Sequence, residues 1–170
     1  MKRLNILFAT IIMVTGLSVG AMAQTENTAV GAKILTAMTI TETAPMHFGT
    51  MTVPTGATTV VLATDGTVTV GSGTTTLLAQ APISTAAAYD ITGDMSATYA
   101  ITIDASSIIT NGTPAEDMTV NAFVCSYAGL TSTLDAGGAD NFTVGATLNL
   151  VDAQPAGTYA GTFDVTVAYN

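Results

Sequence analysis

Hydrophobic and polar residues alternate along the last fourteen residues of the chain, from Gly157 to Asn170. The larger apolar side chains all fall on odd positions, and small or polar side chains fall between them. These apolar residues are Tyr159, Phe163, Val165, Val167 and Tyr169. Since successive side chains of a strand point to opposite faces, the pattern predicts a half-buried strand that runs to the end of the chain. Because free ends usually fray, strong β-formers here predict that the strand is paired.

The same two-residue period returns in shorter runs, separated by turn signals, along the rest of the chain. The expected strands are 33–43, 46–53, 58–63, 67–70, 87–93, 98–104, 118–126 and 142–151, followed by the C-terminal strand. About eight or nine short strands of this kind predict an all-β fold, an antiparallel β-sandwich.

Two turns and one strand allow more detailed predictions. Asp65-Gly66 predicts a hairpin turn, and Asp94-Met95-Ser96 is short enough to join strands 87–93 and 98–104 as a second hairpin. In strand 118–126 the residues expected to point inward are Met118, Val120, Ala122 and Val124. Gly145 is a candidate β-bulge in the strand that follows.

The first residues predict a secretory signal peptide, residues 1–23. Lys2 and Arg3 supply its positive charge, an apolar run follows, and Ala21-Met22-Ala23 fits a cleavage site before Gln24. We therefore expect an exported protein with a flexible extension, 24–32, and one β-sandwich domain, 33–170. No later stretch approaches the ~20 apolar residues of a membrane span, so none is expected after cleavage.

The charge of the processed chain excludes one class of partner. After cleavage Lys33 is the only basic residue against twelve acidic ones, which gives a net charge of −11. Phosphate backbones are bound through clustered Lys and Arg, so we expect no nucleic-acid partner. The acidic residues are interpreted as a solvated surface that keeps the exported protein soluble.

Few residues offer catalytic or metal-binding chemistry. Cys125 is expected to be a buried small hydrophobe, with a disulfide between two chains as the alternative. His47 is the only histidine and has no neighbouring acid in the sequence. Asp135 and Asp140 flank a glycine turn without the dense acidic spacing of a calcium loop. The sequence therefore predicts no catalytic residue, no cofactor and no metal site.

Several segments resemble a bacterial family of small exported domains, DUF4402, which is similar to chaperone–usher pilins and to spore-coat protein U domains. The matching segments are 47–49, 89–93, 144–148 and 157–167. The last is the most specific, because a glycine fourteen residues from the end, alternating hydrophobic residues and a penultimate aromatic resemble the C-terminal signature of pilus subunits. The resemblance implies an immunoglobulin-like sandwich at the bacterial cell surface, reached through the periplasm, and it supplies no reaction. Many pilins carry a disulfide, which a chain with Cys125 alone cannot form internally.

Three functions remain in order of preference. The first is a structural subunit of a fimbria or pilus, joined by β-strand addition, in which an unfilled groove of the sandwich accepts an extended segment from a neighbour. The C-terminal strand, from Gly157 to Tyr169, is the candidate assembly strand. The alternating residues of that candidate donor are Thr28, Val30, Ala32 and Ile34. Its partners would be further copies, other surface subunits and a periplasmic chaperone. The second is a self-contained adhesive surface module, and the third is a carboxylate-based hydrolase.

Overall fold

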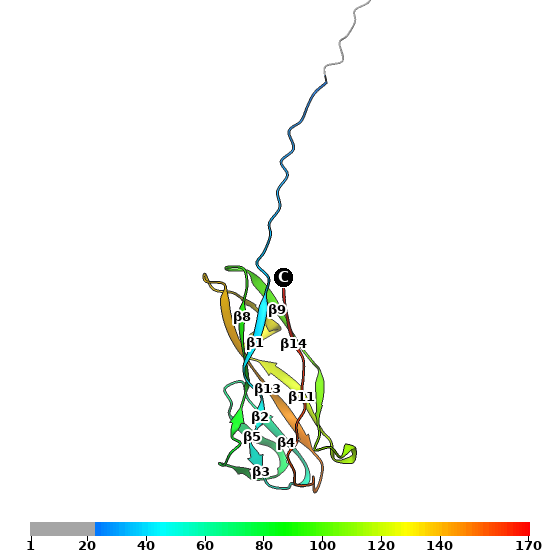
Figure 1. Cartoon of the computed structure of the whole chain (residues 1–170). Coiled ribbons are helices and arrows are strands. Elements are labelled where there is room, and N and C mark those ends of the chain that lie inside the picture. Colours follow the sequence, from blue (N-terminus) through cyan, green and yellow to red (C-terminus); the bar gives the residue numbers. More distant parts are fainter. Residues whose placement is uncertain (1–22) are drawn as a thin grey trace, which may run out of the picture. The chain divides into compact units, whose positions relative to one another are not determined.

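The computed structural model describes residues 23–170, and Figure 1 shows the chain as a ribbon. The chain divides into two units, residues 1–33 and residues 34–170. Within the first unit, residues 24–33 form no strand or helix and their side chains are exposed. The expected signal peptide lies, except for Ala23, outside the described residues.

The second unit is all-β and every strand pair in it is antiparallel. The expected eight or nine strands are divided more finely, because 46–54 and 74–85 pair only in two-residue ladders. The strands are β1 (Thr39–Ala44), β2 (His47–Phe48), β3 (Thr50–Met51), β4 (Thr55–Leu62), β5 (Val68–Thr74), β6 (Leu77–Leu78), β7 (Ser84–Thr85), β8 (Ala87–Thr92), β9 (Thr98–Ile103), β10 (Ser106–Ile109), β11 (Met118–Cys125), β12 (Thr131–Thr133), β13 (Ala139–Leu150) and β14 (Val165–Tyr169). Two short 3₁₀ turns, Pro114–Glu116 and Ala128–Leu130, complete the structure.

The long strand β13 organises the larger sheet. Its first half pairs with β8 and its second half with β4, while β11 pairs along the other edge. β1 then extends the sheet beyond β8, β5 beyond β4 and β10 beyond β11. The even-numbered apolar residues of β13 are buried from Phe142 to Leu150, so one strand with a strict two-residue period supports both halves of the domain.

A smaller sheet, in the order β12-β9-β14, shares a core with the upper part of the larger sheet. This core contains Ala87, Tyr89, Ile91, Tyr99, Ile101, Leu134, Phe142 and Val144. The other core lies lower in Figure 1 and contains Phe48, Val60, Leu62, Met118, Val120, Ala146, Leu148 and Leu150. Because side chains of both sheets interdigitate in the upper core, the arrangement is sandwich-like.

One of the two predicted hairpins is confirmed and the other is wrong. Asp65 and Gly66 form the turn between β4 and β5, where the Asp65 carboxylate accepts the backbone N–H of Thr67 at 2.8 Å. By contrast, β8 and β9 belong to different sheets. The chain therefore crosses from one sheet to the other at 93–97, and Tyr89 and Tyr99 both contribute to the core that the sheets share. The two-residue period marks these strands but does not identify their partners.

The predicted inward face of 118–126 holds for only half of the strand. Met118 and Val120 are buried, but Val124 is 48% exposed. The register of β11 against β13 shifts between Asn121 and Val124, where Ala122 has a positive φ of 49°. The bulge expected at Gly145 therefore lies in the neighbouring strand. Gly145 serves close packing instead, because a Cβ there would meet the backbone of Leu62.

Candidate assembly groove

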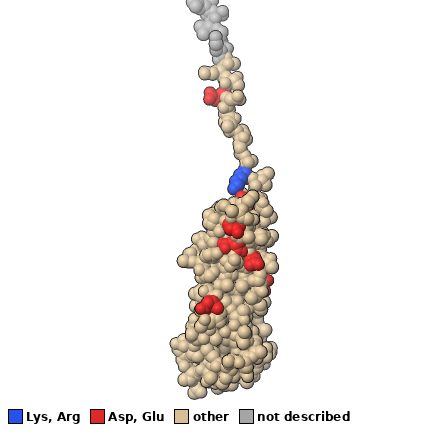
Figure 2. Space-filling view, turned by 90° about the vertical axis from the view of Figure 1, so that its left-hand side faces the viewer, with Lys and Arg blue, Asp and Glu red and all other residues tan. Residues whose placement is uncertain are grey.

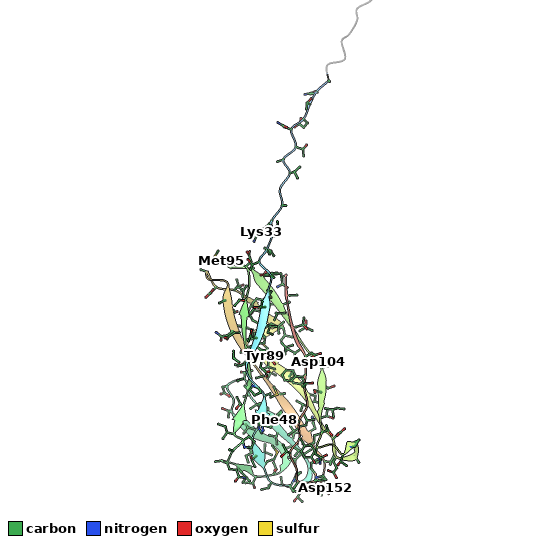
Figure 3. All side chains as sticks on the ribbon, viewed as in Figure 1. Lys33, Phe48, Tyr89, Met95, Asp104 and Asp152 are labelled. Carbon is green, nitrogen blue, oxygen red and sulfur yellow. The ribbon has the colours of Figure 1, made fainter. Side chains whose placement is uncertain are left out.

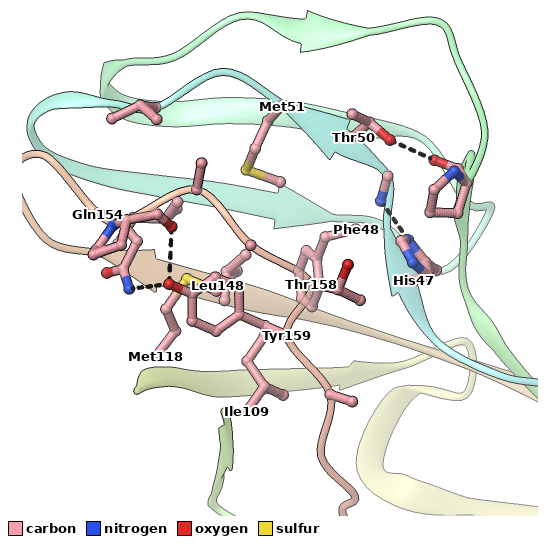
Figure 4. Close-up of a pocket in the computed structure, with 18 of the residues that line it drawn as sticks. His47, Phe48, Thr50, Met51, Ile109, Met118, Leu148, Gln154, Thr158 and Tyr159 are labelled. Carbon is pink, nitrogen blue, oxygen red and sulfur yellow. Dashed lines mark hydrogen bonds between the residues drawn. The ribbon is translucent and has the colours of Figure 1, made fainter. Parts of the chain in front are cut away.

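A cavity of about 710 Å³ opens between two stretches of chain that lie far apart in sequence (Figure 4). One wall is formed by residues 46–54, and the other by residues 154–161, which lead toward β14. The side chains that line it between the walls are apolar and come from the lower core: Ile109, Met118, Leu148 and Leu150. The groove defined by these residues is called the lower groove below.

The wall that leads to β14 is extended but largely unpaired. The expected continuous strand 157–170 is corrected here, because regular pairing begins only at Val165. Before that point Ala160 forms an isolated antiparallel bridge with Thr110. Among the described residues, the backbone N–H and C=O groups of Tyr159 and Gly161 have no hydrogen-bond partner. Since alternate residues of an extended chain present these groups to opposite sides, Tyr159 and Gly161 direct theirs away from β10.

Close packing on β10 explains one of the two glycines in this wall. A Cβ on Gly161 would overlap the carbonyl oxygen of Ile108, so the chain can approach β10 only without a side chain. A Cβ on Gly157 would make only ordinary contacts, at 3.5 Å with the Asn111 side chain and 3.6 Å with the Tyr159 ring. The glycine that the C-terminal signature contains is therefore not the one that packing requires.

The opposite wall is held from behind by side-chain and backbone bonds. His47 accepts the backbone N–H of Gly49 on Nδ1 at 2.8 Å, which holds the turn between β2 and β3. Thr50 donates to the carbonyl oxygen of Pro82, and the N–H of Thr52 donates to Thr76. Val53, next along the wall, makes no backbone hydrogen bond within the described part of the chain. Both walls thus carry backbone groups without a hydrogen-bond partner in the described part of the chain.

The polar groups at the lower end of the groove are already bonded to one another. Gln154 is only 3% exposed, and its amide donates to the Glu116 carbonyl and to the Tyr159 hydroxyl. Tyr159 in turn donates to the carbonyl of Pro155 at 2.9 Å. Because these groups need no further partner, the groove offers apolar surface and free backbone rather than side-chain hydrogen bonds.

Further along, β14 is an edge strand whose only partner within residues 23–170 is β9. Its odd-numbered side chains pack on the upper core and its even-numbered ones are exposed. Phe163, just before β14, stacks on Phe123 with ring centroids 4.7 Å apart. The Tyr169 hydroxyl accepts the N–H of Asp94 and donates to the carbonyl of Thr36. β1 and β14 are in contact but not hydrogen-bonded to each other.

The structure separates the C-terminal candidates into two groups. Gly157 and Tyr159 line the lower groove, whereas the residues from Phe163 onward pack on the upper core: Phe163, Val165, Val167 and Tyr169. The candidate donor side chains are all exposed: Thr28, Val30, Ala32 and Ile34. Of these, Val30 is 96% and Ile34 92% exposed, unusual values for large apolar residues.

Sequence reasoning predicted that Met118 points inward, but it did not single out Met51 or Gln154. Met51, Met118 and Gln154 come from three separate segments, and only the fold brings them together. Phe48 lies within a segment that carried the family resemblance. That resemblance was the one available signal for the wall formed by residues 46–54.

The acidic residues form turns and bonded networks. The Asp135 carboxylate accepts hydrogen bonds from the backbone N–H groups of Gly137 and Ala139. These bonds stabilise the turn, so Asp135 has a structural role there. On the face shown in Figure 2, acidic side chains lie mainly over the upper part of the domain and the lowest part carries none. Within residues 23–170 no group of three His, Cys, Asp or Glu side chains could hold a metal ion, and no helix there has the length and hydrophobicity to cross a membrane.

Asp140 is the most heavily bonded carboxylate. It accepts hydrogen bonds from the hydroxyls of Tyr99 (2.9 Å), Tyr127 (2.6 Å) and Ser132 (2.7 Å). Burial opposes its ionisation, but these bonds and that from the Asn141 N–H hold the pKa of Asp140 below its ordinary value. Burial and the bond to Asp140 raise the pKa of Tyr99. The network links β9, β12 and β13, so we interpret it as a connection between the two sheets.

Cys125 lies at the end of β11, half-buried and unpaired by any disulfide. It packs against the upper core, and its sulfur accepts the backbone N–H of Tyr127 at 3.5 Å.

Comparison with known proteins identifies the family. No curated protein and no solved structure matches the chain. One family model, described as a domain of unknown function (DUF4402), matches residues 38–169, which is nearly all of the described β domain. The chain therefore belongs to the DUF4402 family.

Proposed function

We propose that this protein is an exported structural subunit of a fimbria-like surface assembly, in which neighbouring copies are joined by β-strand addition. The observation that carries the proposal is the lower groove, with apolar side chains between its walls and unpaired backbone on both of them. An extended segment placed there would pair with the N–H and C=O groups of Tyr159 and Gly161 and cover Met118 and Leu148.

The donor in this proposal is the segment Thr28–Ile34 of a neighbouring copy. It belongs to no strand, and its large apolar side chains, Val30 and Ile34, are almost fully exposed. An apolar groove is complementary to this segment, because seating there would remove the exposed apolar side chains of the donor from water and pack them over the apolar floor of the groove. A periplasmic chaperone would offer a strand to the same groove before assembly.

One observation favours the second function, a self-contained adhesive module. β1 contacts β14, and the bond from Tyr169 to Thr36 joins the first and last segments of the domain without a partner chain. The upper core is therefore closed by the chain itself, and only the lower groove is left for a donor.

A peptide experiment separates the two functions. A variant lacking 24–32 should remain folded and monomeric, and a peptide of residues 24–36 should bind it one to one in calorimetry. The peptide with Val30→Asp should not bind, because a carboxylate would enter the apolar groove. Ala29→Asp is the matched control, since residue 29 of the inserted strand points out of the groove.

Size-exclusion chromatography of the processed full-length chain completes the test. Strand addition predicts a ladder of multimers that the deletion abolishes. A stable monomer that does not bind the peptide would contradict strand addition and favour the adhesive module.

A further inference from the structure

The two ends of the β domain carry exposed apolar side chains. Met95 and Asp152 mark these opposite ends in Figure 3. At the first end Met95 is 68% exposed, next to Asp94, whose N–H is bonded to Tyr169. At the second end Val53 is 52% and Val151 58% exposed. The second end is also the lower mouth of the groove, because Val53 lines it.

An acidic residue, Asp152, lies at that mouth. Asp152 accepts the backbone N–H of Gly56 through one oxygen at 2.6 Å, and the next residue, Ala153, donates its N–H to Pro54. Pro54 itself lines the groove. The only basic residue among residues 23–170 is Lys33, which lies within the candidate donor segment. Charge complementarity therefore favours a contact between the lysine of one copy and the mouth of the next.

The direction of the inserted strand decides where Lys33 arrives. With Val30 in the groove, Lys33 lies three residues further, about 10 Å along the strand. If the donor runs antiparallel to 157–163, Lys33 emerges at the mouth beside Asp152. If it runs parallel, Lys33 lies toward Asp164, beside β1 and β14.

The short link to the donor's own domain favours the antiparallel direction. Only residues 35–38 separate Ile34 from β1, a span of at most about 18 Å. In the parallel direction the donor's domain would have to fit against the flank of the acceptor, where β1 and β14 already contact each other. In the antiparallel direction the chain leaves through the open mouth, and the two domains meet end to end.

We propose that Lys33 of one copy pairs with Asp152 of the next, so that the end bearing Met95 is seated on the rim formed by Val53 and Val151. The proposal rests on the proposed function, because strand addition brings the ends together. Such a contact joins two different surfaces and repeats without closing, which produces a linear chain of subunits. An exposed ion pair adds little affinity, so its main effect is to fix direction and register.

A charge exchange in the full processed chain tests the pairing. Lys33→Asp and Asp152→Lys should each weaken subunit association about fivefold or more, measured by sedimentation at low salt. The double variant should regain most of the association, because the pair is restored with its charges exchanged. The loss in the single variants should shrink at 0.5 M salt through screening. A double variant no better than the singles would overturn the pairing.

A second charge exchange tests the parallel strand direction. Lys33→Asp combined with Asp164→Lys should not recover association, and recovery there would overturn the antiparallel direction. Asp152→Asn guards against misfolding of the lysine variant, since its side chain can still accept the Gly56 N–H. This milder variant should lose association while its unfolding midpoint stays close to that of the wild type.

Cross-linking gives an independent readout. In a Cys125→Ser background, Lys33→Cys with Asp152→Cys should yield disulfide-linked ladders on oxidation, whereas Lys33→Cys with Asp164→Cys should not. Val30→Asp separates the two proposals. If it assembles normally, strand addition by this segment fails. The other outcome is that Val30→Asp blocks assembly, while Lys33→Asp with Asp152→Lys does not restore association and Lys33→Cys with Asp152→Cys forms no ladder. In that case only the pairing of Lys33 with Asp152 is wrong.

Discussion

The hydroxyl of Tyr169 donates a hydrogen bond of 2.7 Å to the carbonyl oxygen of Thr36, which joins the penultimate residue to the segment before the first strand. The same hydroxyl accepts the N–H of Asp94 at 2.6 Å. Gly93 leaves room for the ring, because a Cβ there would overlap the Tyr169 hydroxyl. The penultimate aromatic thus fixes the C-terminal strand at a point where three segments meet.

Tyr169→Phe should therefore destabilise the domain although the ring is retained. The Asp94 N–H and the Thr36 carbonyl would both lose their partner, and we expect a loss of about 1–3 kcal/mol in the free energy of unfolding. Urea unfolding followed by circular dichroism measures it. Thr166→Val, on the exposed side of the same strand, is the control and should change little. Equal midpoints for wild type and Tyr169→Phe would contradict the role of the hydroxyl.

Phe163→Ala should have a larger effect than Thr162→Ala. Phe163 is half-buried rather than fully buried, so the loss should fall below that of a fully buried ring, at about 2–4 kcal/mol. Part of it is the stacking on Phe123, worth roughly 0.5–1.5 kcal/mol in a double-mutant cycle with Phe123→Leu. Thr162 is exposed, and its bond with Ser107 uses the backbone carbonyl, which alanine keeps. Similar losses for both variants would show that the two faces are assigned wrongly.

The sequence predicted the strands of this fold better than their partners. The alternation from Phe163 to Tyr169 is local, so it could be recognised without knowing the fold. The sheet assignment of Tyr89 and Tyr99 could not be, because pairing is decided by contacts between distant segments. The exposed Val124 shows the same limit, since a single bulge at Ala122 reverses the faces of all residues after it.

The groove was only half predictable for a related reason. Tyr159 belongs to the alternating C-terminal segment, but Met51 and Gln154 acquire their role from a cavity between segments about a hundred residues apart. The C-terminal signature in the sequence pointed to Gly157 rather than to Gly161. Only the closeness of Ile108 in the folded domain shows that packing requires Gly161.

Acid should weaken the link between the sheets through Asp140. Its pKa is lower in the folded state than its ordinary value, so it stabilises the fold at pH values above the ordinary pKa of about 4, and this contribution is lost as the pH falls through the folded value. Asp140→Asn should lower stability at pH 7 by roughly 1–3 kcal/mol and reduce the further loss at pH 3. Asp90→Asn, an exposed carboxylate on β8, is the control. Thermal unfolding at both pH values measures the difference, and parallel acid losses in wild type and Asp140→Asn would contradict it.

The two glycines of the groove wall offer the sharpest comparison. Gly161→Ala places a methyl group against the Ile108 carbonyl, so the wall must move away from β10, at a cost of about 1–3 kcal/mol. Gly157→Ala meets the side chains of Asn111 and Tyr159 at ordinary contact distances and should be tolerated. Because movement of the wall would also shift the backbone groups of Tyr159, Gly161→Ala should weaken binding of the 24–36 peptide by more than Gly157→Ala does. Calorimetry on the two variants, with unfolding measured in parallel, checks both effects. Equal stability and equal peptide affinity in the two variants would show that the wall does not depend on close packing against β10.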